Sequence, residues 1–357
     1  MKRAGIANLP LHNGRAPSWL FNMMKKLARE ICLVIVEEFG REEFLRRISD
    51  PVWFQSFGCV LGFDWHSSGL TTTTLGALKE GLKEINYEGG IYIAGGKGKR
   101  GLSTPEEIKL FAEKKGFNPE PLIYSSRITA KVDNVAIQDG YSIYQHFFIF
   151  DERGNWVVIQ QGMNSYISMA RRYHWFSEGL NSFIVEPHRG ICGKKEGRVL
   201  NMVARESLNC QNYSIKLLEE KNEVLNTLKK IPQLNLPYHH QIFWKNTDRK
   251  RLKEVFISLS RKKIKDFENL LNVRGVGPKT VRAMALLCEI IYGVTPSYTD
   301  PVRYTFAHGG KDGHPFPVDK EVYVQSINML TEVLRRCKIP PIQKERKLRK
   351  LAFLLKS

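Results

Sequence analysis

The sequence predicts an α+β protein, in which a mixed N-terminal domain with an antiparallel sheet is followed by an all-α C-terminal domain. Segments rich in aromatic and β-branched residues lie in the first half of the chain. Beyond about residue 195 they give way to long stretches with helical spacing. One of the helical regions contains a Gly-Val-Gly turn between two apolar segments. We therefore place the two domains at residues 1–193 and 194–357.

Helices are expected early in the N-terminal domain. The apolar residues of Trp19–Phe39 recur at helical spacing, and Gly40 marks the end of this helix. Thr71–Ile85 also has a helical pattern. A further helix should begin at Thr104, because a proline follows at the first helical position and a glutamate at the third.

A sheet is expected in the later part of the same domain. Gly89–Ala94 is predicted to be a short strand that leads into a glycine-rich basic loop, Gly95–Gly101. The pattern of Ser126–Gln161 is that of β-structure. Its clearest strands are Tyr141–Phe150 and Asn155–Gln161, which a typical hairpin turn connects.

The C-terminal domain is expected to consist of helices. Its periodic segments are Gln211–Lys230, Arg249–Ser260, Ile264–Leu271, Thr280–Tyr292, Lys320–Cys337 and Lys344–Lys356.

The charge of the chain indicates a polyanionic partner. Its 55 lysines and arginines outnumber 36 aspartates and glutamates, which gives a formal net charge of +19. Clustered cations bind a phosphate backbone favourably because binding releases its counterions. We therefore expect a nucleic acid as the partner, most simply double-stranded DNA. A lysine-rich thermophile surface is the alternative, but such surfaces usually balance lysine with glutamate.

Cysteine usage and hydropathy indicate a soluble cytoplasmic protein. The six cysteines include no CxxC pair, which argues against a zinc ribbon and against an iron–sulfur loop of local spacing. The chain opens with no signal peptide, and its longest apolar runs are far too short to span a bilayer. We expect no membrane partner.

The most specific motif lies in the C-terminal domain, at Leu270–Thr280. Two glycines permit a tight turn with unhindered N–H groups, and the apolar helix that follows offers its positive N-terminal end. Such a helix-hairpin-helix holds a DNA phosphate without reading sequence. The expected DNA contacts here are Arg274, Gly275, Gly277, Lys279 and Thr280.

This segment resembles the helix-hairpin-helix of the DNA glycosylase superfamily that includes endonuclease III. The resemblance implies that Lys279 is a Schiff-base nucleophile and that Asp300, in Tyr298-Thr299-Asp300-Pro301, is its essential aspartate. The separation of the two is a few residues longer than in that family, and no iron–sulfur cysteines follow. Similar strings occur in repair polymerases, ligases and nuclease subunits, where the lysine only contacts phosphate. Both roles of Lys279 therefore stay open.

The whole chain also resembles an uncharacterised family of archaea and thermophilic bacteria. The strings that carry this resemblance are Leu9-Pro10-Leu11-His12, Phe63-Asp64-Trp65-His66-Ser67-Ser68-Gly69, Gln138-Asp139-Gly140-Tyr141, Gln160-Gln161-Gly162-Met163-Asn164, Arg171-Arg172-Tyr173-His174-Trp175 and Ala307-His308-Gly309-Gly310-Lys311-Asp312-Gly313. The resemblance implies no settled function.

The N-terminal domain contains a second set of candidate residues. Asp64, His66, Asp133, Asp139 and His146 are candidates for a centre that holds a metal or a scissile phosphate, with Asp133 and Asp139 as the ligands of Mg²⁺ or Mn²⁺. The acid-x-Lys ending of many nucleases is missing, and isolated aspartates and histidines in turns are mostly caps. Further DNA contacts are expected at Lys97, Lys99, Arg100, Arg171, Arg172, Tyr173, His174 and Trp175.

Three functions follow from these observations. The first is a repair enzyme, a DNA glycosylase with AP lyase activity that flips a damaged base out of duplex DNA and needs no cofactor. The second is a metal-dependent, structure-specific nuclease with its active site in the N-terminal domain and the hairpin as a clamp. The third is a DNA-binding protein without catalytic activity.

Overall fold

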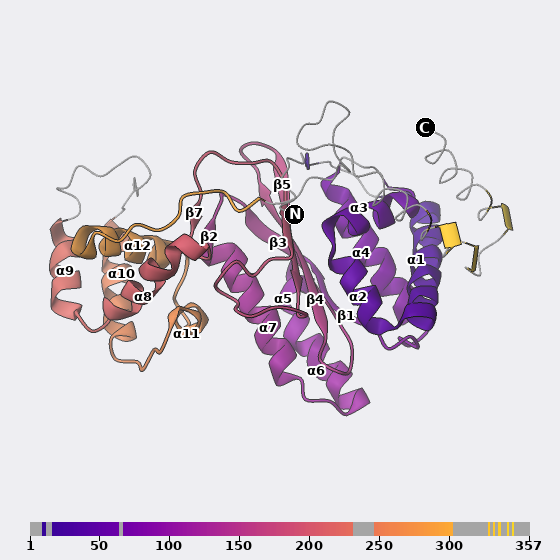
Figure 1. Cartoon of the computed structure of the whole chain (residues 1–357), viewed down its shortest axis with the longest axis horizontal. Helices are drawn as coiled ribbons and strands as arrows, with labels where there is room; N and C mark the ends of the chain where they lie inside the picture. Colours follow the sequence, from indigo (N-terminus) through magenta and orange to yellow (C-terminus); the bar gives the residue numbers. More distant parts are fainter. Residues whose placement is uncertain are drawn as a thin grey trace.

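A central antiparallel sheet with helices on both faces organises the molecule (Figure 1). The computed structural model describes residues 9–11, 16–63, 67–230 and 246–302, together with scattered helical positions between 328 and 345. The five-stranded sheet has the order β1-β3-β4-β5-β6. Its strands are β1 (Tyr92–Lys97), β3 (Ser142–Phe150), β4 (Trp156–Asn164), β5 (Met169–Phe176) and β6 (Gly190–Cys192).

Four helices from the start of the chain cover one face of the sheet. These are α1 (Ser18–Phe39), α2 (Arg41–Ser49), α3 (Pro51–Val60) and α4 (Ser68–Lys83). Alternate strand residues such as Ile93, Ile149 and Val157 pack into the same buried cluster as the apolar faces of these helices. The predicted first helix is confirmed, and it ends at Gly40, whose φ of +90° a glycine adopts without strain.

The other face of the sheet is covered by α6 (Thr104–Lys115) and α7 (Glu120–Lys131), while the short α5 (Lys99–Leu102) follows β1. A π-helical turn, η1 (Val132–Ala136), extends α7, and β2 (Ile137–Gln138) follows it. The expected β-structure from Ser126 onward is therefore wrong up to Ala136. Within this helix, Ser125 and Thr129 each donate a hydroxyl hydrogen bond to a carbonyl one turn earlier, at 2.9 and 2.8 Å, so their polar groups are satisfied locally.

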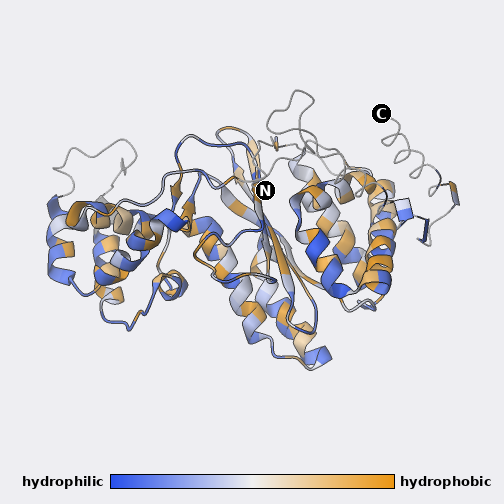
Figure 2. Cartoon of the chain, viewed as in Figure 1, coloured by the Kyte–Doolittle hydropathy of each residue, from blue (hydrophilic) through white to orange (hydrophobic). Residues whose placement is uncertain are grey.

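The predicted hairpin of long strands is confirmed as β3 and β4. These strands pair in antiparallel register, with Phe148 opposite Val158 and Phe150 opposite Trp156. A register shift between Ile143 and Gln145 marks a β-bulge near the start of β3. Figure 2 shows apolar residues along the strands, and apolar and polar residues alternating along the helices.

The described residues after Cys192 form β7 (Leu200–Asn201), η2 (Arg205–Ser207) and a group of helices. The helices are α8 (Leu208–Lys216), α9 (Lys221–Lys230), α10 (Asn246–Leu259), α11 (Phe267–Asn272) and α12 (Pro278–Tyr292). The strand β7 pairs with β2, so this part also contributes to a small two-stranded sheet.

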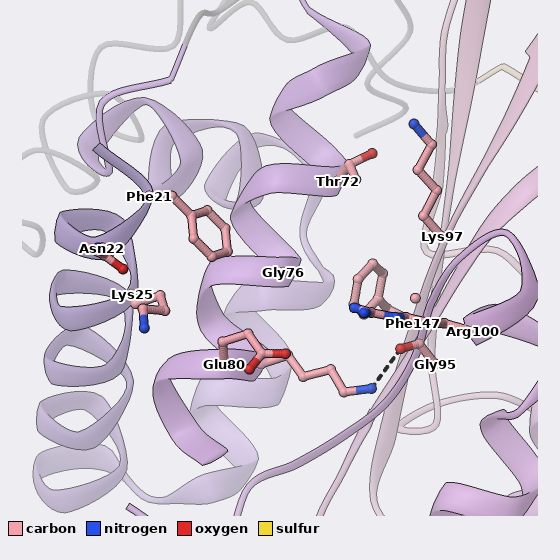
Figure 3. Close-up of a pocket in the computed structure, with 12 residues that line it drawn as sticks. Phe21, Asn22, Lys25, Thr72, Gly76, Glu80, Gly95, Lys97, Arg100 and Phe147 are labelled. Carbon is pink, nitrogen blue, oxygen red and sulfur yellow. Dashed lines mark hydrogen bonds between the residues drawn. The ribbon is translucent and has the colours of Figure 1, made fainter. Parts of the chain in front are cut away.

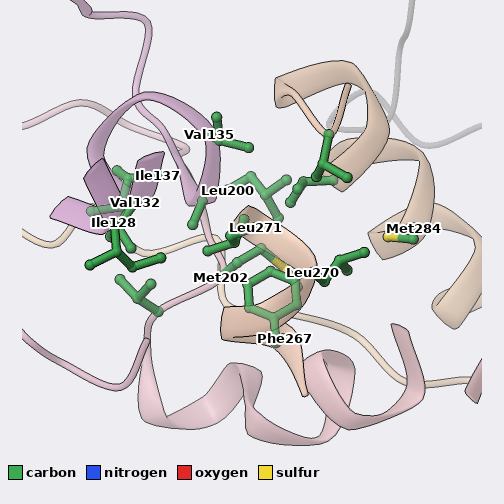
Figure 4. Packing of buried hydrophobic residues seen from close by; sticks show 14 of the residues in the cluster. Ile128, Val132, Val135, Ile137, Leu200, Met202, Phe267, Leu270, Leu271 and Met284 are labelled. Atoms are coloured by element: carbon green, nitrogen blue, oxygen red, sulfur yellow. The ribbon is translucent and has the colours of Figure 1, made fainter. Parts of the chain in front are cut away.

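One hydrophobic cluster joins these helices to the central sheet. It contains Phe148 and Trp175 of the sheet and also Leu271 and Leu286 of the C-terminal helices. Figure 4 shows side chains of α7 and η1, including Val132, converging on those of α11. The protein is thus a mixed α+β structure, and the boundary at residues 193/194 stays a prediction. None of the described helices is long and apolar enough to cross a membrane.

Candidate nucleic-acid interface and adjoining cavity

The predicted helix-hairpin-helix is formed by α11, the turn after it and α12. Asp266 caps α11, because its side chain accepts the N–H of Asn269 at 2.7 Å. Gly275 has a φ of +98°, which favours glycine at this point of the turn. Gly277 is the N-cap of α12, and no side chain caps this helix. The first turn of α12 therefore presents the positive end of its dipole without a competing side-chain oxygen.

Gly277 leaves open space on the outer side of the hairpin. Its backbone is extended, at φ −136° and ψ −176°, so any residue can adopt this conformation. A Cβ atom added at Gly277 would meet nothing within 4 Å. The fold itself therefore does not require a glycine here, and a side chain would obstruct only a molecule that approaches from outside.

Two hydrogen bonds from α7 and β2 to carbonyl groups of the hairpin hold it in place. Lys131 Nζ donates to the carbonyl of Val276 at 2.9 Å, and Gln138 Nε2 donates to that of Pro278 at 2.8 Å. Gln138 in turn accepts from Arg282 Nε at 2.7 Å. Burial lowers the pKa of Lys131. These contacts fix the hairpin against α7 and β2.

A cavity of about 820 Å³ opens beside the hairpin. Its lining comes from four segments that lie far apart in the sequence: the stretch from Gly98 to Glu106, α7 with η1, β3 and the hairpin. Gly95 lets β1 run close to β3, because a Cβ atom there would lie 2.2 Å from the carbonyl oxygen of His146. This volume lies in the range of small-molecule sites.

A network of buried hydrogen bonds begins at two residues that line this cavity. Ser126 Oγ and His146 Nε2 are 2.9 Å apart, and both residues line the cavity. His146 Nδ1 is 2.9 Å from Gln160 Oε1, and Gln160 Nε2 donates to Asp133 Oδ2 at 2.6 Å. His188 Nε2 lies 2.6 Å from the other oxygen of Asp133. Burial lowers the pKa of His146, which keeps the imidazole neutral.

The structure brings together His146 and Asp133 but not Asp139. Asp139 accepts hydrogen bonds from Arg171 Nη1 at 2.9 Å and from the Tyr173 hydroxyl at 2.6 Å. Asp133 instead has Gln160, Trp175 and His188 as partners. Among the described residues, no group of three or more histidine, cysteine, aspartate or glutamate side chains is arranged to hold a metal ion. Asp64 and His66 lie outside the described residues.

Asp300 is engaged by Arg171 rather than exposed beside Lys279. Its two oxygens receive Arg171 Nη1 at 3.1 Å and Nη2 at 2.7 Å, and the N–H of Glu196 donates to Oδ2 at 2.6 Å. The side chain of Asp300 is fully buried, whereas Lys279 is exposed on the first turn of α12. The arrangement expected from the glycosylase resemblance therefore has no support in these contacts.

Strand β5 buries the residues expected to touch DNA between Arg171 and Trp175. Arg172 donates to His174 Nε2, Thr71 Oγ1 and Gln55 Oε1 at 2.9 to 3.1 Å, and Trp175 Nε1 donates to Asp133. All five side chains of this run are fully buried in the protein. They are not available for stacking on bases, because β5 lies inside the sheet with helices on both sides. Thr280 is also buried.

The predicted basic loop remains on the surface. Lys97, Lys99 and Arg100 are exposed. Lys97 and Arg100 also line a second hollow of about 570 Å³ between β1 and the helices α1 and α4 (Figure 3). There Lys79 Nζ donates to the carbonyl of Gly95 at 2.7 Å and pairs with Glu107 at 2.5 Å, so part of its charge is neutralised.

A family model covers most of the chain. The family described as "Protein of unknown function (DUF763)" matches residues 5–318. The chain belongs to this family. No curated protein and no solved structure matches the chain, and nothing in these comparisons links it to the helix-hairpin-helix glycosylases. The expected resemblance to an uncharacterised family is thus confirmed over residues 5–318.

Sequence reasoning missed two partners of His146 in this DUF763 protein: Ser126, which lines the cavity, and Gln160, which is fully buried. Ser126 was assigned to β-structure, and Gln160 was noted only as part of a pair of glutamines. Pro121, near the start of α7, was a signal for the helix that carries Ser126. No local signal pairs Ser126 with His146, because tertiary packing alone brings α7 against β3.

Proposed function

We propose that this protein binds the DNA backbone without sequence preference, with the hairpin of α11 and α12 as its main phosphate contact. The observation that carries the proposal is the open N-terminus of α12 at Gly277, which lies on the rim of the 820 Å³ cavity. A phosphate there would accept N–H hydrogen bonds and interact with the helix dipole.

The charges around the hairpin support the same proposal. Arg274 and Lys279 are exposed on the hairpin, and Arg127 is exposed on the cavity lining. The glycine loop, of which Gly98 and Gly101 line the same cavity, also carries the exposed Lys99 and Arg100. Exposed cations around a cavity suit a polyanion, and the formal net charge of +19 adds long-range attraction.

DNA repair by a glycosylase with AP lyase activity is the second candidate. The cavity beside the hairpin favours it, because a base flipped from the duplex needs a pocket near the phosphate contact. Lys279 would have to act without Asp300, whose carboxylate is bound by Arg171. Borohydride trapping on lesion-bearing duplexes in EDTA tests this candidate, since Lys279→Gln would abolish any trapped adduct.

The proposed binding is tested by adding a side chain at Gly277. Gly277→Leu should weaken binding to duplexes of any sequence by about tenfold or more, because the side chain occupies the place of the phosphate. Fluorescence anisotropy with a labelled duplex measures the affinity. Gly197→Leu is the matched control, because a Cβ atom there also meets nothing within 4 Å and Gly197 does not line the cavity. Equal affinities of the two variants would contradict the proposal.

A further inference from the structure

The hydrogen bonds around His146 determine which of its nitrogens carries the proton. Trp175 Nε1 is only a donor, so Asp133 Oδ2, which lies 2.9 Å from it, is an acceptor. The group of Gln160 that faces the same oxygen at 2.6 Å must then be its NH₂. Gln160 therefore turns its carbonyl oxygen to His146 Nδ1, which must carry the hydrogen.

This assignment leaves His146 Nε2 with a lone pair that points at Ser126. The hydroxyl of Ser126 is 2.9 Å from that nitrogen and donates its proton to it. A hydroxyl, an imidazole base and a third group that orients the base are the parts of a nucleophilic serine centre. Here the amide of Gln160 orients the base, and Asp133 fixes the amide.

The surroundings of Ser126 indicate the class of electrophile. Arg127 is the next residue on α7, and Lys131 lies one turn further on and donates to the hairpin carbonyl of Val276. The hairpin residue Gly277 lines the same cavity as Ser126. A DNA backbone held at the hairpin would bring a phosphodiester near Ser126 as the electrophile. The cations would stabilise the negative charge that develops on it during the reaction.

We propose that Ser126 is a nucleophile toward a phosphodiester of the bound nucleic acid, with His146 as general base and then general acid. The proposal rests on the DNA binding proposed above. A bond forms between Ser126 Oγ and phosphorus while the bond from phosphorus to one sugar oxygen breaks. The serine proton passes to His146 Nε2 and from there to the departing sugar oxygen.

The second step restores the protein. Water attacks the phosphorus of the phosphoserine diester and gives a proton to His146 Nε2. The proton then returns to Ser126 Oγ as the bond from phosphorus to serine breaks. The sum of both steps is the hydrolysis of one phosphodiester by one water molecule, without any oxidant or reductant.

A small phosphodiester tests the serine centre independently of DNA binding. The full-length protein should release nitrophenolate from bis(4-nitrophenyl) phosphate in EDTA. Ser126→Ala should lower the rate by about 100-fold or more, and His146→Gln should do the same. Ser125→Ala is the matched control, because Ser125 is also buried on α7 but donates to the carbonyl of Pro121. Release that is absent in the wild type, or unchanged in Ser126→Ala, overturns the inference.

A labelled duplex separates failure of this inference from failure of the proposed binding. The wild-type protein should form an SDS-resistant adduct with DNA that mass spectrometry maps to Ser126. Ser126→Ala should form no adduct but keep its affinity in anisotropy. Tight binding with neither an adduct nor strand cleavage, or an adduct at another residue, overturns the inference and leaves the proposed binding intact. If the wild-type protein does not bind the duplex, the proposed function is wrong.

Discussion

At the residue scale, Arg171 connects two carboxylates that come from distant parts of the chain. Its guanidinium contacts Asp139, which follows β2, and Asp300, which follows α12. All three side chains are buried, and Tyr173 and the N–H of Glu196 provide further hydrogen bonds. Removing one member of such a group leaves an uncompensated charge inside the protein. We therefore assign Asp300 a structural contribution.

Asp300→Ala should lower the free energy of unfolding by about 3–5 kcal/mol, because Arg171 would lose its bidentate partner while it stays buried. Chemical denaturation with urea measures the change. The control is Glu178→Ala, which removes the exposed partner of Arg46 and should cost less than about 1 kcal/mol. If Asp300→Ala unfolds at the same urea concentration as the wild type, the structural assignment is wrong.

At the element scale, the approach of β1 to β3 shapes one wall of the 570 Å³ hollow between β1 and the helices α1 and α4. Gly95 and Gly96 lie within β1, opposite Phe147 and His146 of β3. The sequence predicts the glycine loop to be a basic, solvated segment that contacts DNA. Its first glycine is also needed for packing, because the carbonyl of His146 and the hydroxyl of Thr104 occupy the place of a side chain.

Gly95→Ala should destabilise the protein by about 2 kcal/mol or more, since strain at positive φ and a backbone clash act together. Gly154→Ala is the matched control, because both glycines have a φ of +90° and only Gly154 has open space around it. The control should cost about 1 kcal/mol, from the strain of the backbone alone. Equal changes in the free energy of unfolding for the two variants would show that the contact with His146 is unimportant.

The elements that the sequence predicted well are those with long, regular patterns. The helix from Ser18 to Phe39, the β3–β4 hairpin and the helix-hairpin-helix all follow from local periodicity and turn residues. The second half of α7 did not, because serine and threonine lower the helical signal while their hydroxyls are satisfied within the helix.

The hairpin, His146 and Asp133 of the candidate site could be predicted from local sequence, but the hydrogen-bond partners of His146 could not. Ser126 and Gln160 lie 20 and 14 residues from His146, and no motif marks these separations. The burial of Arg171–Trp175 could not be predicted from local sequence either. Cations beside aromatic rings occur both on DNA-binding surfaces and in buried polar clusters. Burial of strand β5 between two layers of helices decided between these interpretations.

At the scale of the whole molecule, one apolar cluster runs from the central sheet into the C-terminal helices. Lys131 and Gln138 add hydrogen bonds between the two parts. The cavity depends on this packing, because its lining includes residues of both parts. Separation of the parts would remove the hairpin from Ser126 and His146.

Limited proteolysis should cut the exposed segment between Lys194 and Arg198, where glycine and charged residues predominate. The two fragments should then stay together, because the shared cluster and the Arg171–Asp300 ion pair hold them. Size-exclusion chromatography under native conditions measures this association. Fragments that elute separately would show two independent domains.

Site-specific photo-crosslinking tests whether the hairpin touches the DNA backbone at Gly277. Benzoylphenylalanine at position 278, which is exposed and lines the cavity next to Gly277, leaves the space at Gly277 open. On irradiation with a duplex, this protein should form a covalent adduct that added salt suppresses, because salt weakens phosphate contacts. The same residue at position 197, outside the cavity lining, should form little adduct. DNA binding without an adduct at position 278, or equal adducts at both positions, would show that the hairpin is not the DNA contact.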